Sequence, residues 1–149
     1  MSKKRKLGID YGEARVGIAI TDALNITIQG LESIKRNDSD KVVLKRMDEI
    51  LATYDVDTLV VGMPYNMDGT MSKRCEITKE FIHKLKCKYN GYEIVEVDER
   101  LTTVAAHKTM NYLDVNKRQK RNIVDTISAE YILEKYVNKL KNILQNDAK

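Results

Sequence analysis

A chain of 149 residues and 17.1 kDa has the length of one domain, long enough to bury a sheet beneath helices without disulfides or a structural metal. Its 42% hydrophobic and 32% charged residues exclude a disordered chain. No segment reaches the roughly 20 apolar residues that span a bilayer, and the start lacks the apolar run of a secretory signal. We therefore expect a single cytoplasmic domain over residues 1–149, with its core at about residues 6–140 and no membrane partner.

The net charge of +4 comes with basic residues gathered at two places, Lys3 to Lys6 and residues 117–121. Such patches are typical of proteins that bind a polyanion such as nucleic acid. The alternative, a solvated terminus and a solvated loop, has equal weight on charge alone.

Cysteine and histidine are scattered along the chain. Cys75 and Cys87 form neither a CxxC pair nor a disulfide framework, and His83 and His107 stand apart from each other. Because tetrahedral zinc sites need clustered ligands, we expect any catalytic metal ion to be held by oxygen atoms.

The first elements along the chain are predicted to form a three-stranded meander. Lys6–Asp10 and Val16–Ile20 are apolar runs on either side of a glycine-containing turn, which is the pattern of a hairpin. Apolar residues at period two predict a third strand over Asn25–Ile34.

The pattern then changes to that of helices alternating with buried strands. Apolar residues at three- to four-residue steps predict an amphipathic helix over about residues 43–54, behind the capping candidates Asp38 and Ser39. The continuous apolar run Thr58–Gly62 is typical of a strand buried on both faces of a parallel sheet. The loop 63–70 follows at the edge where ligands bind in such sheets.

The rest of the chain continues this alternation. The predicted elements are a helix from Ser72 to about Lys88, a strand Glu93–Val97, a short helix Thr102–Met110, a basic connector Asn111–Asn122 and a long helix from Ile123 to about Leu144. The order β-β-β-α-β-α-β-α-α, with right-handed crossovers, places both later strands parallel to the first. This predicts an α/β fold with a five-stranded mixed sheet flanked by helices.

Asp10 is the first of three acidic positions that plain packing explains poorly. It ends the first apolar strand and shares a face with Gly8, while Leu7 and Ile9 point the other way. An Asp that caps a turn at a strand end is an equally good explanation of this position alone.

Asp98 and Glu99 are consecutive acids at the carboxyl end of the strand Glu93–Val97. They repel each other unless a cation lies nearby. Alternation puts them on opposite faces if the strand persists, so only one of them is expected to bind metal. The alternative role of helix capping is already available to Thr102 and Thr103.

Asp125 is the third position. It shares a helix face with Ala129, Ile132 and Tyr136, which is expected to press on the sheet, and the small Ser128 and Ala129 would let the helix approach closely. The alternative is an acid in the first turn, favoured by the helix dipole by about 0.3–1 kcal/mol.

If the three acids converge at one sheet edge, they can hold divalent cations. Mg²⁺ or Mn²⁺ prefers oxygen ligands, and two ions roughly 3.5–4 Å apart can hold the attacking and leaving oxygens of a phosphodiester. We therefore predict hydrolysis by water at two ions that Asp10 bridges. Asp125 and Glu99 complete the set of ligands, and Asp98 is the competitor of Glu99.

Four motifs follow one another along residues 6–137. They are Gly8-Ile-Asp10-Tyr-Gly12 with Arg15-Val-Gly17-Ile-Ala19, Val61-Gly62-Met63-Pro64 with Asn66-Met-Asp68-Gly69-Thr70, Asp98-Glu-Arg-Leu-Thr-Thr103, and Val124-Asp125 with Ser128-Ala129. Each is weak to moderate alone, but in this order and spacing they resemble the YqgF family of Holliday-junction-resolvase-like nucleases.

This resemblance implies a ribonuclease H-like fold, a cytoplasmic location and a role in processing the 5′ end of the small-subunit (16S) rRNA precursor. It maps the family's acidic residues onto Asp10, Glu99 and Asp125. Family members usually carry an apolar residue where this chain has Tyr65, which could stack on a base or merely fill the position.

With a nucleic-acid substrate, guanidinium, ammonium and amide groups near the acids become candidate phosphate contacts. These are Arg15, Asn66, Arg100, Lys117 and Arg118. A solvated surface explains the last two at least as well.

Other functions fit part of the sequence. A Holliday-junction resolvase acting on branched DNA would use the same chemistry, although structured RNA is favoured by the family resemblance. A non-catalytic nucleic-acid-binding or ribosome-associated module would not need the three acids. Sugar-kinase and Hsp70-like ATPases share the Asp-x-Gly hairpin but need two such domains. A symmetric resolvase should be a homodimer, and an RNA processor could be a monomer.

Overall fold

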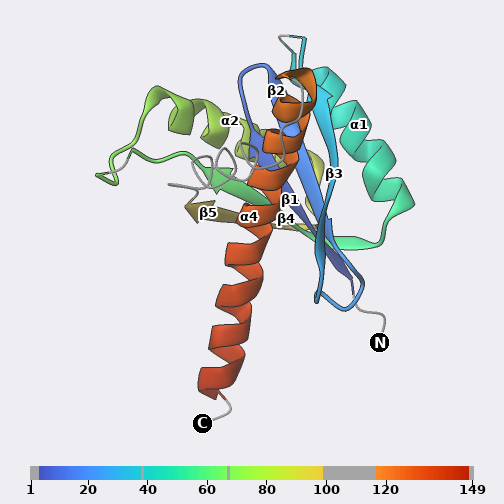
Figure 1. The fold of residues 1–149 in the computed structure, drawn as a ribbon, viewed down its shortest axis with the longest axis vertical. Coiled ribbons are helices and arrows are strands. Elements are labelled where there is room, and N and C mark those ends of the chain that lie inside the picture. The colour runs from blue at the N-terminus through green and yellow to red at the C-terminus, as the bar shows by residue number, and fades with distance from the viewer. Residues whose placement is uncertain (1–3, 38, 67, 99–116, 148–149) are drawn as a thin grey trace.

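The structure is a computed structural model that describes residues 4–37, 39–66, 68–98 and 117–147, with residues 117–125 and 144–147 described by their backbone alone. The elements in chain order are β1 (Arg5–Tyr11), β2 (Arg15–Thr21), β3 (Ile28–Lys35), α1 (Asp40–Thr53), β4 (Val56–Met63), α2 (Lys73–Lys88), β5 (Glu93–Asp98) and α4 (Lys117–Asp147) (Figure 1). None of these helices is both long and apolar enough to cross a lipid bilayer.

The five strands form one sheet in the order β3-β2-β1-β4-β5, with β1 at its centre. The pairs β1–β2 and β2–β3 are antiparallel, and the pairs β1–β4 and β4–β5 are parallel. The predicted mixed sheet is therefore confirmed, and so is the parallel direction of both later strands.

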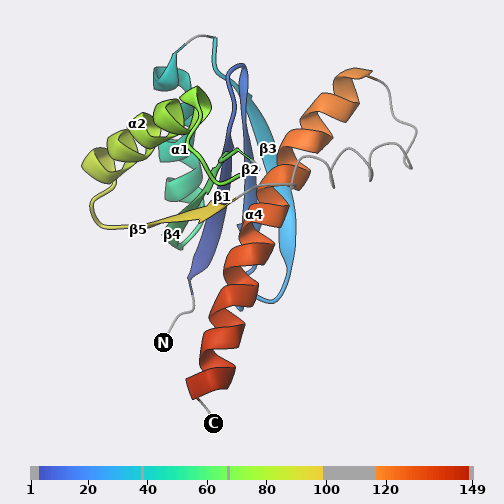
Figure 2. The same cartoon turned by 90° about the vertical axis from the view of Figure 1, so that its left-hand side faces the viewer.

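Helices cover both faces of the sheet, with α1 and α2 on one face and α4 on the other (Figure 2). Side chains alternate between the two layers as the period-two pattern requires. In β1, Leu7 and Ile9 belong to the larger core under α1 and α2, whereas Gly8 faces α4. The smaller core lies under α4 and includes Ala129 and Ile132, as the helical periodicity predicted.

Both helices of the larger layer begin at serines that cap them. The Ser39 side chain accepts a hydrogen bond from the amide of Lys41, and Ser72 accepts one from the amide of Cys75. Each serine satisfies an amide that the helix itself leaves without an acceptor. Ser39 is thus the cap predicted from the sequence, whereas the other candidate, Asp38, lies outside the described residues.

The third strand begins at Ile28 instead of Asn25, so this predicted boundary was three residues early. The carboxylate of Asp22 accepts a hydrogen bond from the amide of Ile26, and Asn25 adopts a left-handed conformation with φ of 57°. Asparagine tolerates this conformation well, so the segment forms a turn although Ile26 continues the apolar alternation.

The last helix begins at Lys117 instead of Ile123, so the prediction of a connector over residues 117–122 was wrong. This stretch contains no glycine or proline, and its lysines, arginines and glutamine have good helix propensity. The helix continues to Asp147, beyond the predicted end near Leu144. The predicted short helix Thr102–Met110 lies outside the described residues.

Candidate functional site

Asp10 lies near the carboxyl end of the central strand and is partly exposed. It follows Gly8 by two residues and therefore points to the same face, which α4 covers. The adjacent Tyr11 points to the opposite face and packs in the larger core. The structure thus places Asp10 at the sheet edge that the sequence predicted.

Two buried glycines flank Asp10 on the neighbouring strands. Gly17 of β2 pairs with Asp10, and Gly62 of β4 lies at the same level because Ile9 pairs with Val61. Because glycine has no side chain, neither neighbour fills the space beside the carboxylate. A carboxylate is the ligand type that Mg²⁺ and Mn²⁺ prefer. Asp10 therefore has the chemistry and the position expected of the metal ligand that the sequence predicted.

The strand β5 ends at the same edge as β1 but is separated from it by β4, whose last residue Met63 pairs with Asp98. Val95 and Val97 pack in the smaller core under α4, whereas Ile94 packs against the larger core. Alternation therefore directs Asp98 to the face of α1 and α2, opposite to the face of Asp10. Its carbonyl oxygen accepts a hydrogen bond of 2.8 Å from Lys135 of α4.

Glu99 and Arg100 lie outside the described residues. Of the predicted acidic ligands, only Asp10 and Asp98 have described side chains. Within the described part of the chain, no three His, Cys, Asp or Glu side chains form a group that could hold a metal ion.

Helix α4 packs closely on small residues of the sheet. A Cβ atom on Gly8 would lie 2.8 Å from the carbonyl oxygen of Ala129 and 2.6 Å from Cγ of Leu133. On β3, a Cβ atom on Gly30 would lie 2.8 Å from Cβ of Thr126. Such approaches are possible only because both strand residues are glycine. This confirms that α4 comes close to the sheet near Ala129.

Asp125 precedes Ala129 by about one helical turn, and its backbone lies within α4. The carboxyl-terminal half of α4 runs toward the start of the sheet, since Tyr136 lies near Thr58 and Glu93 at the beginnings of β4 and β5. The amino-terminal half of α4 therefore leads toward the opposite edge, at which β1 ends (Figures 1 and 2). The side chains of Asp125, Lys117 and Arg118 are outside the description.

On the other face of the sheet from Asp10, the carboxylate of Asp40 accepts hydrogen bonds from one hydroxyl group and two cationic groups. It accepts hydrogen bonds from the Tyr11 hydroxyl at 2.6 Å, from Nε of Arg36 at 3.2 Å and from Nζ of Lys84 at 2.8 Å. The Tyr11 ring stacks on Phe81 with centroids 4.2 Å apart. Because Tyr11 directly follows Asp10, this network fixes the end of β1. Sequence reasoning missed it, since it joins residues from separate elements.

The charges of this network shift the pKa values of its members. Burial alone would raise the pKa of the Asp40 carboxyl, but hydrogen bonds from Lys84 and Tyr11 and the charge of Arg36 hold it below its usual range. Burial and the hydrogen bond to Asp40 raise the pKa of the Tyr11 hydroxyl. Asp40 is therefore ionised and Tyr11 neutral at pH 7.

Replacing Asp40 with asparagine should lower the free energy of unfolding by about 2–3 kcal/mol at pH 7, because a nearly buried carboxylate with charged donors is lost. The folded pKa of Asp40 lies below its unfolded value of about 3.9, so its contribution is complete above that pH and is lost as pH falls through the folded pKa. Urea unfolding of wild type and variant should therefore differ at pH 7 and converge in acid.

Asp48→Asn is the matched control for this prediction. Asp48 also accepts a tyrosine hydrogen bond, from Tyr89, and pairs with Lys88, but its side chain is about half exposed. Its loss should cost less than about 1 kcal/mol. Equal losses for the two variants would show that burial gives Asp40 no special role.

The predicted phosphate contacts Arg15 and Asn66 occupy different settings. Arg15 begins β2 two residues before Gly17 and lies by alternation on the same face as Asp10. The Asn66 side chain donates a hydrogen bond of 3.0 Å to the Thr70 hydroxyl, which in turn donates to Asp68 at 2.6 Å. Asn66 therefore organises the loop after β4.

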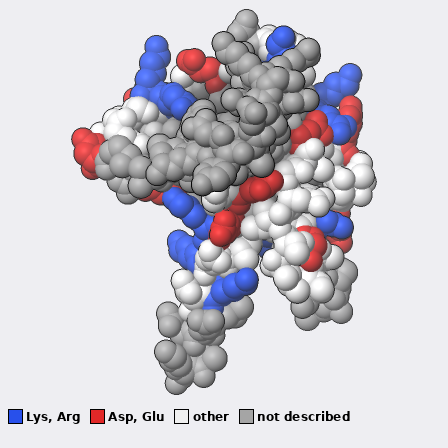
Figure 3. All heavy atoms as spheres, viewed as in Figure 1, with Lys and Arg blue, Asp and Glu red and all other residues white. Residues whose placement is uncertain are grey.

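The basic residues at the start of the chain lie at the opposite edge of the sheet from Asp10. Lys6 pairs with Asp57 at 2.7 Å, Lys4 lies 3.9 Å from Asp55, and the Arg5 guanidinium lies over the Tyr54 ring. On the face drawn in Figure 3, the described Lys and Arg side chains are interspersed with acidic ones. Lys4, Arg5 and Lys6, the described residues of the first basic patch, thus make intramolecular contacts away from the candidate site.

Comparison with known proteins adds a family, close relatives and a fold. Residues 4–139 match the model of the family described as "RuvX: Holliday junction resolvase". A protein of Ruminiclostridium cellulolyticum named "Putative pre-16S rRNA nuclease" is 48% identical over 136 residues, which cover 91% of this chain and 95% of that protein. A protein of the same name from Acetivibrio thermocellus is 46% identical over 140 residues, covering 94% and 99%.

Among solved structures, T. thermophilus RuvC in complex with a Holliday junction substrate superposes with a TM-score of 0.54 at 11% identity. The superposition covers 91% of this chain and 96% of that one. A second structure of Thermus thermophilus RuvC gives a TM-score of 0.52 at 9% identity. This likeness shows the fold, which is ribonuclease H-like as expected.

Proposed function

The chain belongs to the family described as RuvX: Holliday junction resolvase, and on that premise we propose that it is a metal-dependent nuclease that hydrolyses phosphodiester bonds. The names of its close relatives support this activity. The observation that carries the proposal is the place of Asp10, at the carboxyl end of the central strand between two glycines and on the face that α4 covers.

Asp10, Glu99 and Asp125 are the residues that we propose as metal ligands. When bound, two Mg²⁺ or Mn²⁺ ions would neutralise charge on the phosphate and lower the pKa of an attacking water molecule. Asp10 on the central strand would hold both ions, and Asp125 of α4 would supply a further carboxylate.

The alternation of β5 supports Glu99 over Asp98 as the third ligand. Asp98 belongs to the row of Ile94 on the face of α1 and α2, whereas the row of Val95 and Val97 faces α4. Glu99 continues the second row if the strand persists by one residue. A ligand from that row would share the face of Asp10.

For the substrate, we propose the 5′ end of the small-subunit rRNA precursor, which would place the protein in the cytoplasm. This rests on relatives that match nearly the whole chain and are named for pre-16S rRNA. Branched DNA is the second candidate, favoured by the family's description. Arg15, Asn66, Arg100, Lys117 and Arg118 are the proposed phosphate contacts on either substrate, and Asn66 would act from its ordered loop.

The proposal is tested by incubating the purified protein with an rRNA precursor fragment and with a four-way DNA junction, each with Mg²⁺ or with EDTA. We expect cleavage of the RNA that requires Mg²⁺. Cleavage of the junction alone would favour the resolvase, and cleavage of neither would favour a non-catalytic binding module.

In the same assay, Glu99→Gln should slow cleavage at least about a hundredfold, while the cleavage rate of Asp98→Asn should stay within about threefold of the wild type. The reverse pattern would make Asp98 the ligand.

A further inference from the structure

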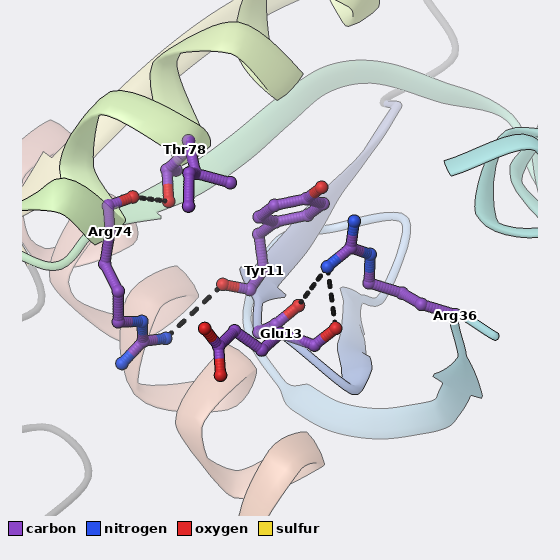
Figure 4. Close-up of a pocket in the computed structure, with 7 residues that line it drawn as sticks. Tyr11, Glu13, Arg36, Arg74 and Thr78 are labelled. Atoms are coloured by element: carbon purple, nitrogen blue, oxygen red, sulfur yellow. Dashed lines mark hydrogen bonds between the residues drawn. The ribbon is translucent and has the colours of Figure 1, made fainter. Parts of the chain in front are cut away.

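Two arginines reach the end of β1 from opposite sides, Arg36 from the segment before α1 and Arg74 from the first turn of α2 (Figure 4). Arg36 is committed to the fold. Its guanidinium pairs with Asp40 and donates to the carbonyl oxygens of Gly12 and Glu13 in the β1–β2 turn. Its loss would therefore disturb the turn itself.

Arg74 makes much weaker contacts. Its guanidinium carries five N–H donors, and among the described residues it forms one hydrogen bond, a long one of 3.5 Å from Nη2 to the carbonyl oxygen of Tyr11. The residue is exposed, and none of the ion pairs between described residues includes it. Glu13 lines the same pocket without pairing with it. A cation in the first turn is also disfavoured by the helix dipole, so Arg74 does not stabilise α2.

The position of Arg74 is nevertheless well defined. The carbonyl oxygen of Tyr11 belongs to the last residue of β1, one beyond Asp10, so the Arg74 guanidinium lies at the carboxyl end of β1, reaching it from the side of α2 while the Asp10 side chain points to the face of α4. A planar guanidinium with several unused donors binds a phosphodiester through two parallel hydrogen bonds.

From these contacts we infer that Arg74 is a phosphate-binding residue, which holds the backbone of the nucleic-acid strand beside Asp10. The inference rests on the proposed function for the presence of a nucleic acid. It extends the proposed phosphate contacts to α2, from which sequence reasoning named no residue. Arg36 supports the same turn but has no donor role toward the substrate.

The test measures equilibrium binding of a fluorescein-labelled RNA hairpin by anisotropy in EDTA, so that cleavage does not interfere, over a series of salt concentrations. Arg74→Gln should weaken binding about five- to tenfold and reduce the slope of log affinity against log salt by about 0.7–0.9, the value for one phosphate contact. Arg74→Lys should keep the slope, because it keeps the charge, and recover part of the affinity.

Lys79→Gln is the matched control, since it removes one charge from an exposed position of the same helix on a different side. It should leave both affinity and slope within error of the wild type. Equal effects of Arg74→Gln and Lys79→Gln, or no effect of Arg74→Gln at an unchanged melting temperature, would overturn the inference. Binding that depends on Arg74 without any Mg²⁺-dependent cleavage would instead refute the nuclease and retain the contact. Mg²⁺-dependent cleavage together with binding that does not depend on Arg74 would support the nuclease and refute the Arg74 contact.

Discussion

Replacing Asp10 with asparagine is expected to abolish Mg²⁺-dependent cleavage and to leave the fold intact. Asparagine has nearly the same shape and a carbonyl oxygen, so the packing beside Gly17 and Gly62 is preserved. It lacks the negative charge that attracts a divalent cation. A loss of about 4 kcal/mol of transition-state stabilisation corresponds to about a thousandfold in rate. Single-turnover cleavage and thermal unfolding of the same preparation measure the two effects.

Asp55→Asn is the control for this variant, because Asp55 is an exposed acid at the opposite edge of the sheet. It should cleave at the wild-type rate. Metal binding can be followed separately by titrating Mn²⁺ and observing its paramagnetic effect on water relaxation. If Asp10→Asn cleaves like the wild type, the proposed metal site is wrong, whatever the substrate.

The fold could be predicted from the sequence mainly because its strands and helices have clear periods. The hairpin of β1 and β2 and the buried run of β4 are bounded by glycines and turns, and family membership supports the ribonuclease H-like fold that the motifs implied. Errors arose where one local preference overrode another. Ile26 continues an apolar alternation, yet the Asp22 carboxylate binds its amide and a turn results.

The candidate site was less accessible to sequence reasoning. The period-two rule placed Asp10 on one face of β1 correctly, because burial on the other face fixes the strand. The network behind it could not be predicted, since Tyr11 and Asp40 are 29 residues apart and only the packed sheet brings them together. Arg74 was missed for the same reason, as its contact with the Tyr11 carbonyl spans 63 residues. Tertiary contacts of this kind leave no period in the sequence.

Substituting alanine for Gly8 should destabilise the protein and slow cleavage together, because Gly8 sets the distance between β1 and α4. The added Cβ atom would lie 2.6 Å from Leu133 Cγ and 2.8 Å from the Ala129 carbonyl oxygen. Leu133 can change rotamer, but the oxygen belongs to the backbone and can move only with the helix. Overpacking of this kind typically costs about 1–3 kcal/mol, and we expect about 2–3 kcal/mol in urea unfolding.

The effect on cleavage follows from the place of Asp125, one turn before Ala129 on the same helix. A displacement of about 1 Å at a reacting centre can cost about a hundredfold in rate, so Gly8→Ala should lower the rate by that order even at a temperature where the variant is fully folded. Gly91→Ala is the control, since a Cβ atom there meets nothing within 4 Å, and it should change neither stability by more than about 1 kcal/mol nor the rate. A variant that loses stability but cleaves normally would mean that the position of α4 does not govern the reaction. Asp125 would then not be the third acidic ligand of the site.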